Sequence, residues 1–215
     1  MRNDAEKKFL EIAGQPRFQG WSLVGDYELG PKIPFFGQQL NYKLLTGEGQ
    51  VEEYTSLLRH FGWVVAFGVT REGMVITLVQ WKPGVNCPSW ELPPGGIGRV
   101  KTDINEEDLL AKTKEAYLRE TGYGSGDWTY LGHTLIETGK FRGANPEDHG
   151  LPAHMYVVTD LEQQAETRKP NANEIMETLL VPLREFRGVV MKPDRLFKET
   201  SALSCALLAL AHLGL

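Results

Sequence analysis

The sequence predicts an α/β (α+β) protein in which helices cover a mixed sheet, preceded by an N-terminal extension that contains strands. Two apolar, β-rich runs over 63–70 and 74–81 flank three turn residues, which predicts a central hairpin. Residues 106–121 follow a capping residue, begin with acidic side chains and end at a glycine, which predicts a long helix. Strands around these two features complete the pattern of a helix–sheet–helix sandwich.

The N-terminal part predicts a short helix over 5–13 and strands over 21–29 and 39–45. Gly30, Pro31 and Pro34 interrupt the chain between those strands, and a polar connection follows them. Because this part is too rich in strands for a tail, we divide the chain into an extension, 1–55, and a main domain, 56–215.

The main domain predicts further elements in order. The two hairpin strands are apolar almost throughout, so we expect both faces of the hairpin to be covered. Asn105 or Asp103 is expected to cap the long helix, and Gly122 to end it. The remaining predicted elements are strands over 128–137, 154–161 and 176–181 and a closing helix over 201–213.

Composition excludes several classes of partner. The net charge of −5 offers no basic field for a long nucleic acid. The apolar segment 202–215 is shorter than the roughly 20 residues that span a bilayer, so no membrane partner is expected. Two distant cysteines and a charged N-terminus without an apolar run after it favour a cytoplasmic protein.

Two segments carry most of the functional information. The first reads W-E-L-P-P-G-G-I-G over 90–98, and the second reads K-E-A-Y-L-R-E-T-G-Y over 114–123. Together they resemble the signature of the Nudix hydrolases, G-x5-E-x7-R-E-U-x-E-E-x-G-U, where U is aliphatic. The resemblance extends from about residue 61 to the end of the chain. It implies a Nudix-type α/β/α sandwich that hydrolyses a nucleoside diphosphate linked to another moiety, with Mg²⁺.

The helical part of this signature is degenerate. Carboxylates spaced i, i+3 and i+4 on a helix converge on one hard cation. Aligned on the final glycine, Glu120 keeps one such position, but Ala116 and Arg119 replace the other two. Moving the register by one residue brings in Glu115, which lies about 140° around the helix from Glu120 and cannot share its cation. We therefore expect Arg119 to pair with Glu120, and the alternative to a metal site is an ordinary solvated helix.

The remaining metal positions follow from the resemblance. The earlier acidic position of the signature falls on Glu107, if residues are inserted around 101–104. In the ADP-ribose pyrophosphatase branch, which the chain resembles most, the carbonyl at the position of Pro94 binds the metal. The resemblance thus implies Mg²⁺ held by Glu120, Pro94 and Glu107.

The same branch suggests the substrate contacts and the catalytic acids. Its strand ending in Q-[YF]-R is similar to 80–82, which gives Trp81 and Lys82 a role in binding substrate. Glu174 is the first choice for the general base, with Glu177 second, and both could equally be solvent-facing acids. Arg142 could bind phosphate from a glycine-rich loop that is otherwise a mobile surface loop.

Two hypotheses for function stay open. The first is a hydrolase acting on an ADP-ribose-like nucleotide, and the second is a catalytically inactive Nudix-fold module that binds a nucleotide or a protein. In the resembling branch, N-terminal strands build a homodimer, so we expect one here. His133 and His154 lie in apolar strands and are expected to be core residues.

Overall fold

The computed structural model describes residues 4–15, 22–33, 37–59, 61–82, 87–99, 105–136, 141–142, 150–164, 176–192, 197 and 199–215. Its contacts divide the chain into two compact units. The first comprises Met1–Arg59 and Glu137–Gly150, and the second comprises His60–Ile136 and Leu151–Leu215. The sequence division at 55/56 left the insertion 137–150 in the main domain. The insertion joins the first unit because β10 (Phe141–Arg142) pairs in parallel with β3 (Val51–Leu58).

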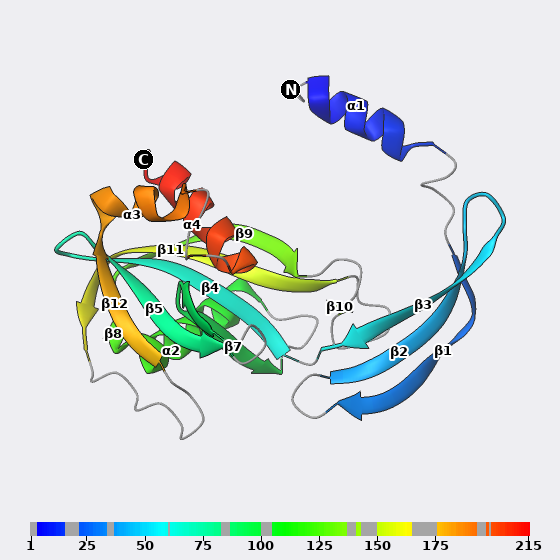
Figure 1. Ribbon diagram of the computed structural model, residues 1–215, viewed down its shortest axis with the longest axis horizontal. Coiled ribbons are helices and arrows are strands. Elements are labelled where there is room, and N and C mark those ends of the chain that lie inside the picture. The colour runs from blue at the N-terminus through cyan, green and yellow to red at the C-terminus, as the bar shows by residue number, and fades with distance from the viewer. Residues whose placement is uncertain are drawn as a thin grey trace. The chain divides into compact units, whose positions relative to one another are not determined.

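The first unit contains helix α1 (Asp4–Ala13) and a four-stranded sheet in the order β1-β2-β3-β10 (Figure 1). Strands β1 (Ser22–Ile33) and β2 (Gly37–Leu45) were predicted, and both of their pairings are antiparallel. The expected break at Gly30 and Pro31 was wrong, because β1 continues through them with a register shift between Leu29 and Lys32. Strand β3 was not predicted, because its first residues are charged and exposed. Pairing with β2 across a tight turn over 46–50 makes it a strand.

The second unit is built on a mixed eight-stranded sheet. The order is β12-β5-β4-β11-β8, with β6 paired to β5, β7 to β4 and β9 to β11. The β4/β11 pairing is parallel and the others are antiparallel, which confirms the predicted mixed sheet. The strands are β4 (Phe61–Thr70), β5 (Met74–Lys82), β6 (Cys87–Glu91), β7 (Pro94–Arg99), β8 (Tyr123–Gly124), β9 (Asp127–Ile136), β11 (Leu151–Gln163) and β12 (Met176–Pro182).

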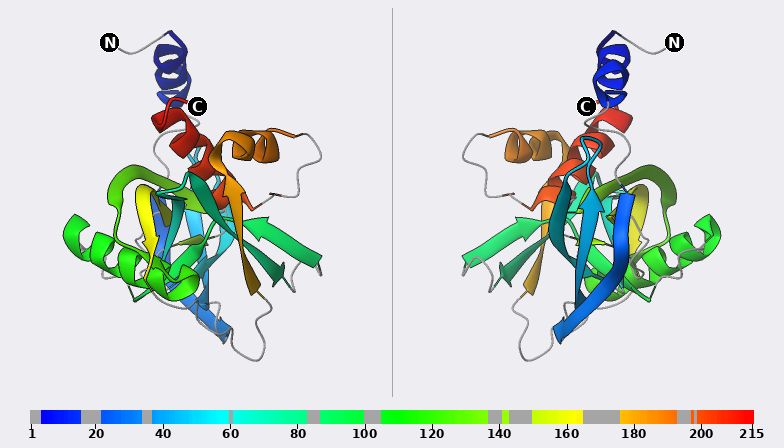
Figure 2. Two further views of the ribbon diagram at one scale, coloured as in Figure 1. Left: turned by 90° about the vertical axis from the view of Figure 1, so that its left-hand side faces the viewer. Right: turned by 90° about the vertical axis from the view of Figure 1, so that its right-hand side faces the viewer.

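Helices cover both faces of this sheet, as Figures 1 and 2 show. Helix α2 (Glu106–Thr121) lies on one side, and α3 (Leu183–Val190) and α4 (Thr200–His212) lie on the other. Alternate residues of β4 enter two separate cores: Val65 and Phe67 pack toward α3 and α4, whereas Ala66 packs toward Tyr117 of α2. The prediction that the hairpin is covered on both faces is confirmed.

Helix α3 was not predicted from the sequence. Helix α3 begins directly after Pro182 and has only eight residues, a length that leaves little periodic signal in the sequence. Within the described ranges, no helix is both long and apolar enough to cross a membrane.

Candidate functional site

Helix α2 is fixed at both ends by its own sequence. The side chain of Asn105 accepts a hydrogen bond from the backbone N–H of Asp108 at 2.7 Å, so Asn105 is the cap. Gly122 adopts a left-handed φ of 76° and donates its N–H to the carbonyl of Leu118 at 2.8 Å. These caps fix where the helix begins and ends.

The segment 92–96, which links β6 to the start of β7 and is called the turn below, packs directly on helix α2. Gly95 pairs with Val64 of β4, and a Cβ built on Gly95 would lie 3.0 Å from the Cβ of Ala116 and 3.1 Å from Cγ2 of Val64. Leu92 is fully buried beneath this turn. A side chain at residue 95 would fit only if these neighbours shifted by a few tenths of an ångström. The signature's turn and helix, which are distant in sequence, therefore form one platform.

Glu120, at an acidic position of the resembling signature, lies on this platform beside the guanidinium group of Arg119. Ala116, at a lost acidic position, is only 2% exposed and is packed against the turn. The side chain of Glu120 is 18% exposed, and its Oε1 lies 3.1 Å from Nε of the more exposed Arg119. The expected pairing of Arg119 with Glu120 is confirmed. Charge neutralisation by a neighbouring guanidinium weakens any attraction of Glu120 for a second cation.

The structure does not bring Glu107 to this platform. Glu107 is exposed in the first turn of α2, and Glu120 follows thirteen residues later in the same straight helix. At about 1.5 Å of rise per residue, the two lie roughly 20 Å apart along the axis, so they cannot bind one cation. The assignment of Glu107 as a ligand beside Glu120 was wrong, because the two side chains lie thirteen residues apart on one continuous helix.

A buried acid beside the turn received no role from the sequence. Glu91 is 1% exposed, and it stands in a row with Leu78 of β5 and Thr178 of β12. Leu78 alternates with Thr77, which bonds Trp90 toward the α4 side, so Glu91 points toward the α2 side. A carboxylate buried on the face that carries the platform is a candidate functional group. Its position in an otherwise apolar strand was the available signal.

The other proposed site residues are placed less completely. Trp81 and Lys82 end β5, with their backbones opposite Pro88 and Cys87. Glu177 is exposed on β12 opposite Val79. Arg142 belongs to β10 in the first unit. Glu174 and the side chains of Trp81, Lys82 and Arg142 lie outside the described residues.

The donor set is small for a metal centre. Within the part of the chain that the structure describes, no three His, Cys, Asp or Glu side chains gather where they could hold one ion. The Pro94 carbonyl and the Glu120 carboxylate are oxygen donors of the kind that Mg²⁺ prefers, and Mg²⁺ commonly takes one or two protein oxygens with water and substrate phosphate. Two such donors would hold an ion only where water and a phosphate complete its coordination.

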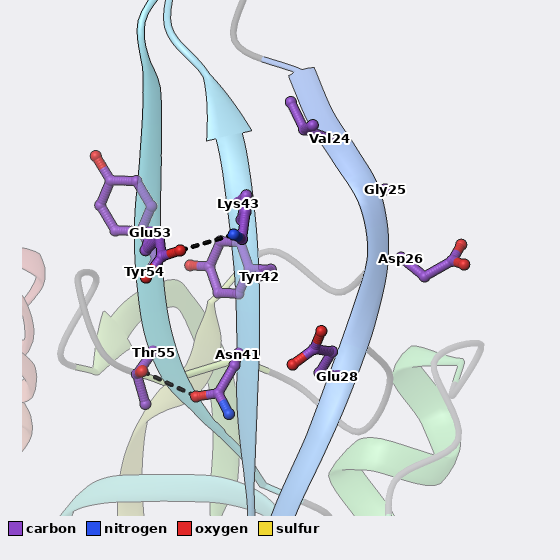
Figure 3. Close-up of a pocket in the computed structure, with 10 residues that line it drawn as sticks. All are labelled: Val24, Gly25, Asp26, Glu28, Asn41, Tyr42, Lys43, Glu53, Tyr54 and Thr55. Atoms are coloured by element: carbon purple, nitrogen blue, oxygen red, sulfur yellow. Dashed lines mark hydrogen bonds and ion pairs between the residues drawn. The ribbon is translucent and has the colours of Figure 1, made fainter.

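Two pockets lie outside this platform. One, of about 780 Å³, is on the sheet of the first unit (Figure 3). Nζ of Lys43 lies 2.7 Å from Oε1 of Glu53 in it, and this hydrogen bond raises the pKa of Lys43 and lowers the pKa of Glu53. Thr55 donates a hydrogen bond of 2.9 Å to Asn41 beside that pair. This pocket is polar and open to solvent.

The other pocket, of about 330 Å³, lies between α2 and strands β9 and β11. The hydroxyl of Tyr130 and Nδ1 of His154 are 3.0 Å apart at its wall. Burial, followed by the neighbouring His133, lowers the pKa of His154. The expectation that both histidines are core residues was wrong for His133, which is exposed on the edge strand β9, and His154 is half-buried.

Comparison with known proteins identifies the fold. The structure resembles the solved structure of an ADP compounds hydrolase, a Nudix fold, with a TM-score of 0.70 over 91% of this chain and 95% of that one. Sequence identity between the two is 16%, so the likeness concerns the fold. No family model and no curated protein matches the sequence. The chain has the Nudix-like fold that its motif resemblance implied.

Proposed function

We propose that this protein is a Nudix-type hydrolase that cleaves a nucleoside diphosphate linked to another moiety, such as ADP-ribose. The observation that carries the proposal is the platform itself, in which Gly95 packs against Ala116 and Glu120 follows on the same helix. The fold shared with a hydrolase of ADP compounds supports this proposal.

Each residue has a role in the proposal. The Pro94 carbonyl and Glu120 would hold Mg²⁺, which when bound neutralises diphosphate charge and lowers the pKa of water. Trp81 and Lys82 would contact the substrate. Glu174 would accept a proton from the attacking water, with Glu177 as the alternative base.

The second candidate is a module that binds a nucleotide or a protein without hydrolysis. The burial of Ala116 and the pairing of Arg119 with Glu120 favour it, because both reduce the negative charge available to a cation. On this alternative, the protein would hold its ligand without a metal.

The two candidates separate in one experiment. Release of AMP from ADP-ribose is measured by chromatography with and without Mg²⁺, and binding of ADP-ribose is measured by calorimetry. The variants are Glu120→Gln and the control Glu115→Gln, an exposed carboxylate on the same helix. Hydrolysis requires Mg²⁺-dependent turnover that Glu120→Gln abolishes and Glu115→Gln keeps. Binding without turnover supports the module. If ADP-ribose is neither bound nor hydrolysed, both candidates are refuted.

A homodimer formed through the first unit is part of the proposal. Pairing of β1 with β2 and of β2 with β3 places Leu23, Leu29 and Tyr54 on one face of that sheet. Their exposed fractions are 38%, 59% and 37%. Large apolar side chains are also exposed on the other face, at Val24, Ile33 and Val51, so both faces of this sheet offer apolar surface that a second copy would cover.

A further inference from the structure

The pocket between α2, β9 and β11 has walls of a particular kind. It is lined by Trp128, Tyr130 and Tyr156 on the strands and by Glu106 and two leucines on the helix. Its volume of about 330 Å³ is at the lower end of the range for small-molecule sites. Tyr156 is 3% exposed and forms the floor, whereas Tyr130 is 41% exposed and stands at the opening.

The aromatic rings do not form one flat platform. The rings of Tyr130 and Tyr156 have centroids 5.2 Å apart and planes inclined by 51°. Those of Trp128 and Tyr156 are 6.0 Å apart and inclined by 69°. A planar base would stack on only one of these rings, whereas a compact cation can contact several ring faces at once.

The charge of the pocket also favours a cation as its ligand. Glu106 is the one lining side chain, among the described residues, that carries a formal charge at neutral pH, since burial keeps the neighbouring His154 neutral. The carboxylate of Glu106 is also close enough to raise the pKa of the Tyr130 hydroxyl, after the effect of burial. A negative charge beside inclined aromatic rings favours a cation and disfavours phosphate.

The protein already places a cation on one of these rings. Nζ of Lys114 lies 5.9 Å from the centre of the Trp128 ring, although Lys114 does not line the pocket. This contact shows that the indole face attracts an ammonium group. It also means that Lys114 would repel a second cation bound nearby.

We propose that this pocket is a second binding site, for a small organic cation with a substituted ammonium group. Glu106 begins the helix on which Glu120 lies in the last turn, about 21 Å further along the axis, although Trp128 of the pocket contacts Tyr117, the residue after Ala116 of the platform. A second site goes beyond the proposed function and can exist whether or not the protein is a hydrolase.

Choline is the probe, and 3,3-dimethyl-1-butanol, in which carbon replaces the charged nitrogen, is its neutral control. Binding of each is measured by calorimetry and by the shift of the Trp128 indole resonance, assigned with Trp128→Phe. We expect choline to bind at least about tenfold more tightly than the neutral control, because a desolvated cation gains from several ring faces. Equal binding of the two would show a merely apolar pocket and would overturn the proposal.

Three variants test the residues. Glu106→Gln should weaken choline binding about fivefold, while Glu107→Gln, an exposed carboxylate of the same turn that does not line the pocket, should leave it unchanged. Lys114→Met keeps an aliphatic stem but removes the competing ammonium, so it should tighten choline binding about twofold to fivefold. Absence of choline binding, or equal effects of the two glutamine variants, would refute the assignment.

Discussion

The Cα of Gly95 faces Ala116 so closely that a Cβ at residue 95 would lie 3.0 Å from the Cβ of the alanine. This contact joins the turn after β6 to the helix that carries Glu120. The turn and the helix thus pack together through a glycine and an alanine. The turn can pack this close to the helix because both Gly95 and Ala116 are small.

Gly95→Ala should destabilise the protein. The new methyl group would crowd both Ala116 and Val64, and overpacking of this kind costs about 1–3 kcal/mol. Gly96→Ala is the matched control, because no described atom lies within 4 Å of a Cβ there. Urea denaturation of both variants measures the difference, and an equal loss in the two would contradict the packing described. Adding Ala116→Gly should recover part of the loss of Gly95→Ala, beyond the cost of glycine in a helix.

Restoring the two lost carboxylates should have unequal effects. Arg119→Glu changes an exposed residue and should alter the free energy of unfolding by less than about 0.5 kcal/mol while tightening Mg²⁺ binding. Ala116→Glu forces a carboxylate into a position that is 2% exposed and should cost about 2–4 kcal/mol. Thermal unfolding and Mg²⁺ titration check both. If Ala116→Glu were as stable as the original chain, the turn would not be packed as described.

The hydroxyl of Tyr117 packs against strand β4 where Gly68 has no side chain. This hydroxyl is buried and has no hydrogen-bond partner among the described residues. Tyr117→Phe should therefore leave the free energy of unfolding unchanged or raise it by up to about 1 kcal/mol. Gly68→Ala should lower it by more than about 2 kcal/mol, because a methyl group there would overlap the tyrosine and Leu161. Chemical denaturation distinguishes the two, and a strongly destabilised Tyr117→Phe would reveal a partner for the hydroxyl.

Because of Cys205, the free energy of unfolding should fall as the pH becomes alkaline. Burial raises the pKa of its thiol from 9.0 to about 12 in the folded protein. The folded state then holds this proton more tightly than the unfolded state does. Its contribution to stability is complete below about pH 9 and is lost as the pH rises toward 12. The free energy of unfolding, measured from pH 8 to pH 11 in a Cys87→Ala background, should fall more steeply than in the same background with Cys205→Ala.

The same thiol should resist labelling in the native state. Cys205 is fully buried, and its Sγ lies 3.5 Å from the carbonyl oxygen of Tyr156. In the Cys87→Ala background, a disulfide reagent at pH 8 should react only after unfolding, because the thiolate is the reactive form. Rapid labelling of the native protein would contradict this burial.

Leu29→Lys should dissociate the proposed homodimer. Leu29 lies on the sheet face that also carries Leu23 and Tyr54, whereas Val24 lies on the opposite face, beside Lys43. Light scattering should give a dimer for the original chain and for Val24→Lys, and a monomer for Leu29→Lys, because a buried lysine at the interface would lose its hydration. A monomeric original chain would refute the dimer.

The site was predictable in its local parts and not in its assembly. The bounds of helix α2, the caps at Asn105 and Gly122, and the pairing of Arg119 with Glu120 all depend on residues a few positions apart, so the sequence indicates them. Helix α3 and the short strands β6, β7, β8 and β10 were missed because they exist only where other strands or helices meet them.

The sequence by itself determined the local elements of this protein: the covered hairpin, the capped helix and the loss of two carboxylates are matters of residue type and spacing. The tertiary structure alone decided what those elements bring together. It buried Ala116 under Gly95, turned Glu91 inward and gathered Trp128, Tyr130 and Tyr156 around one pocket. Such contacts join residues distant in the chain, and packing between layers, which no local spacing encodes, fixes them.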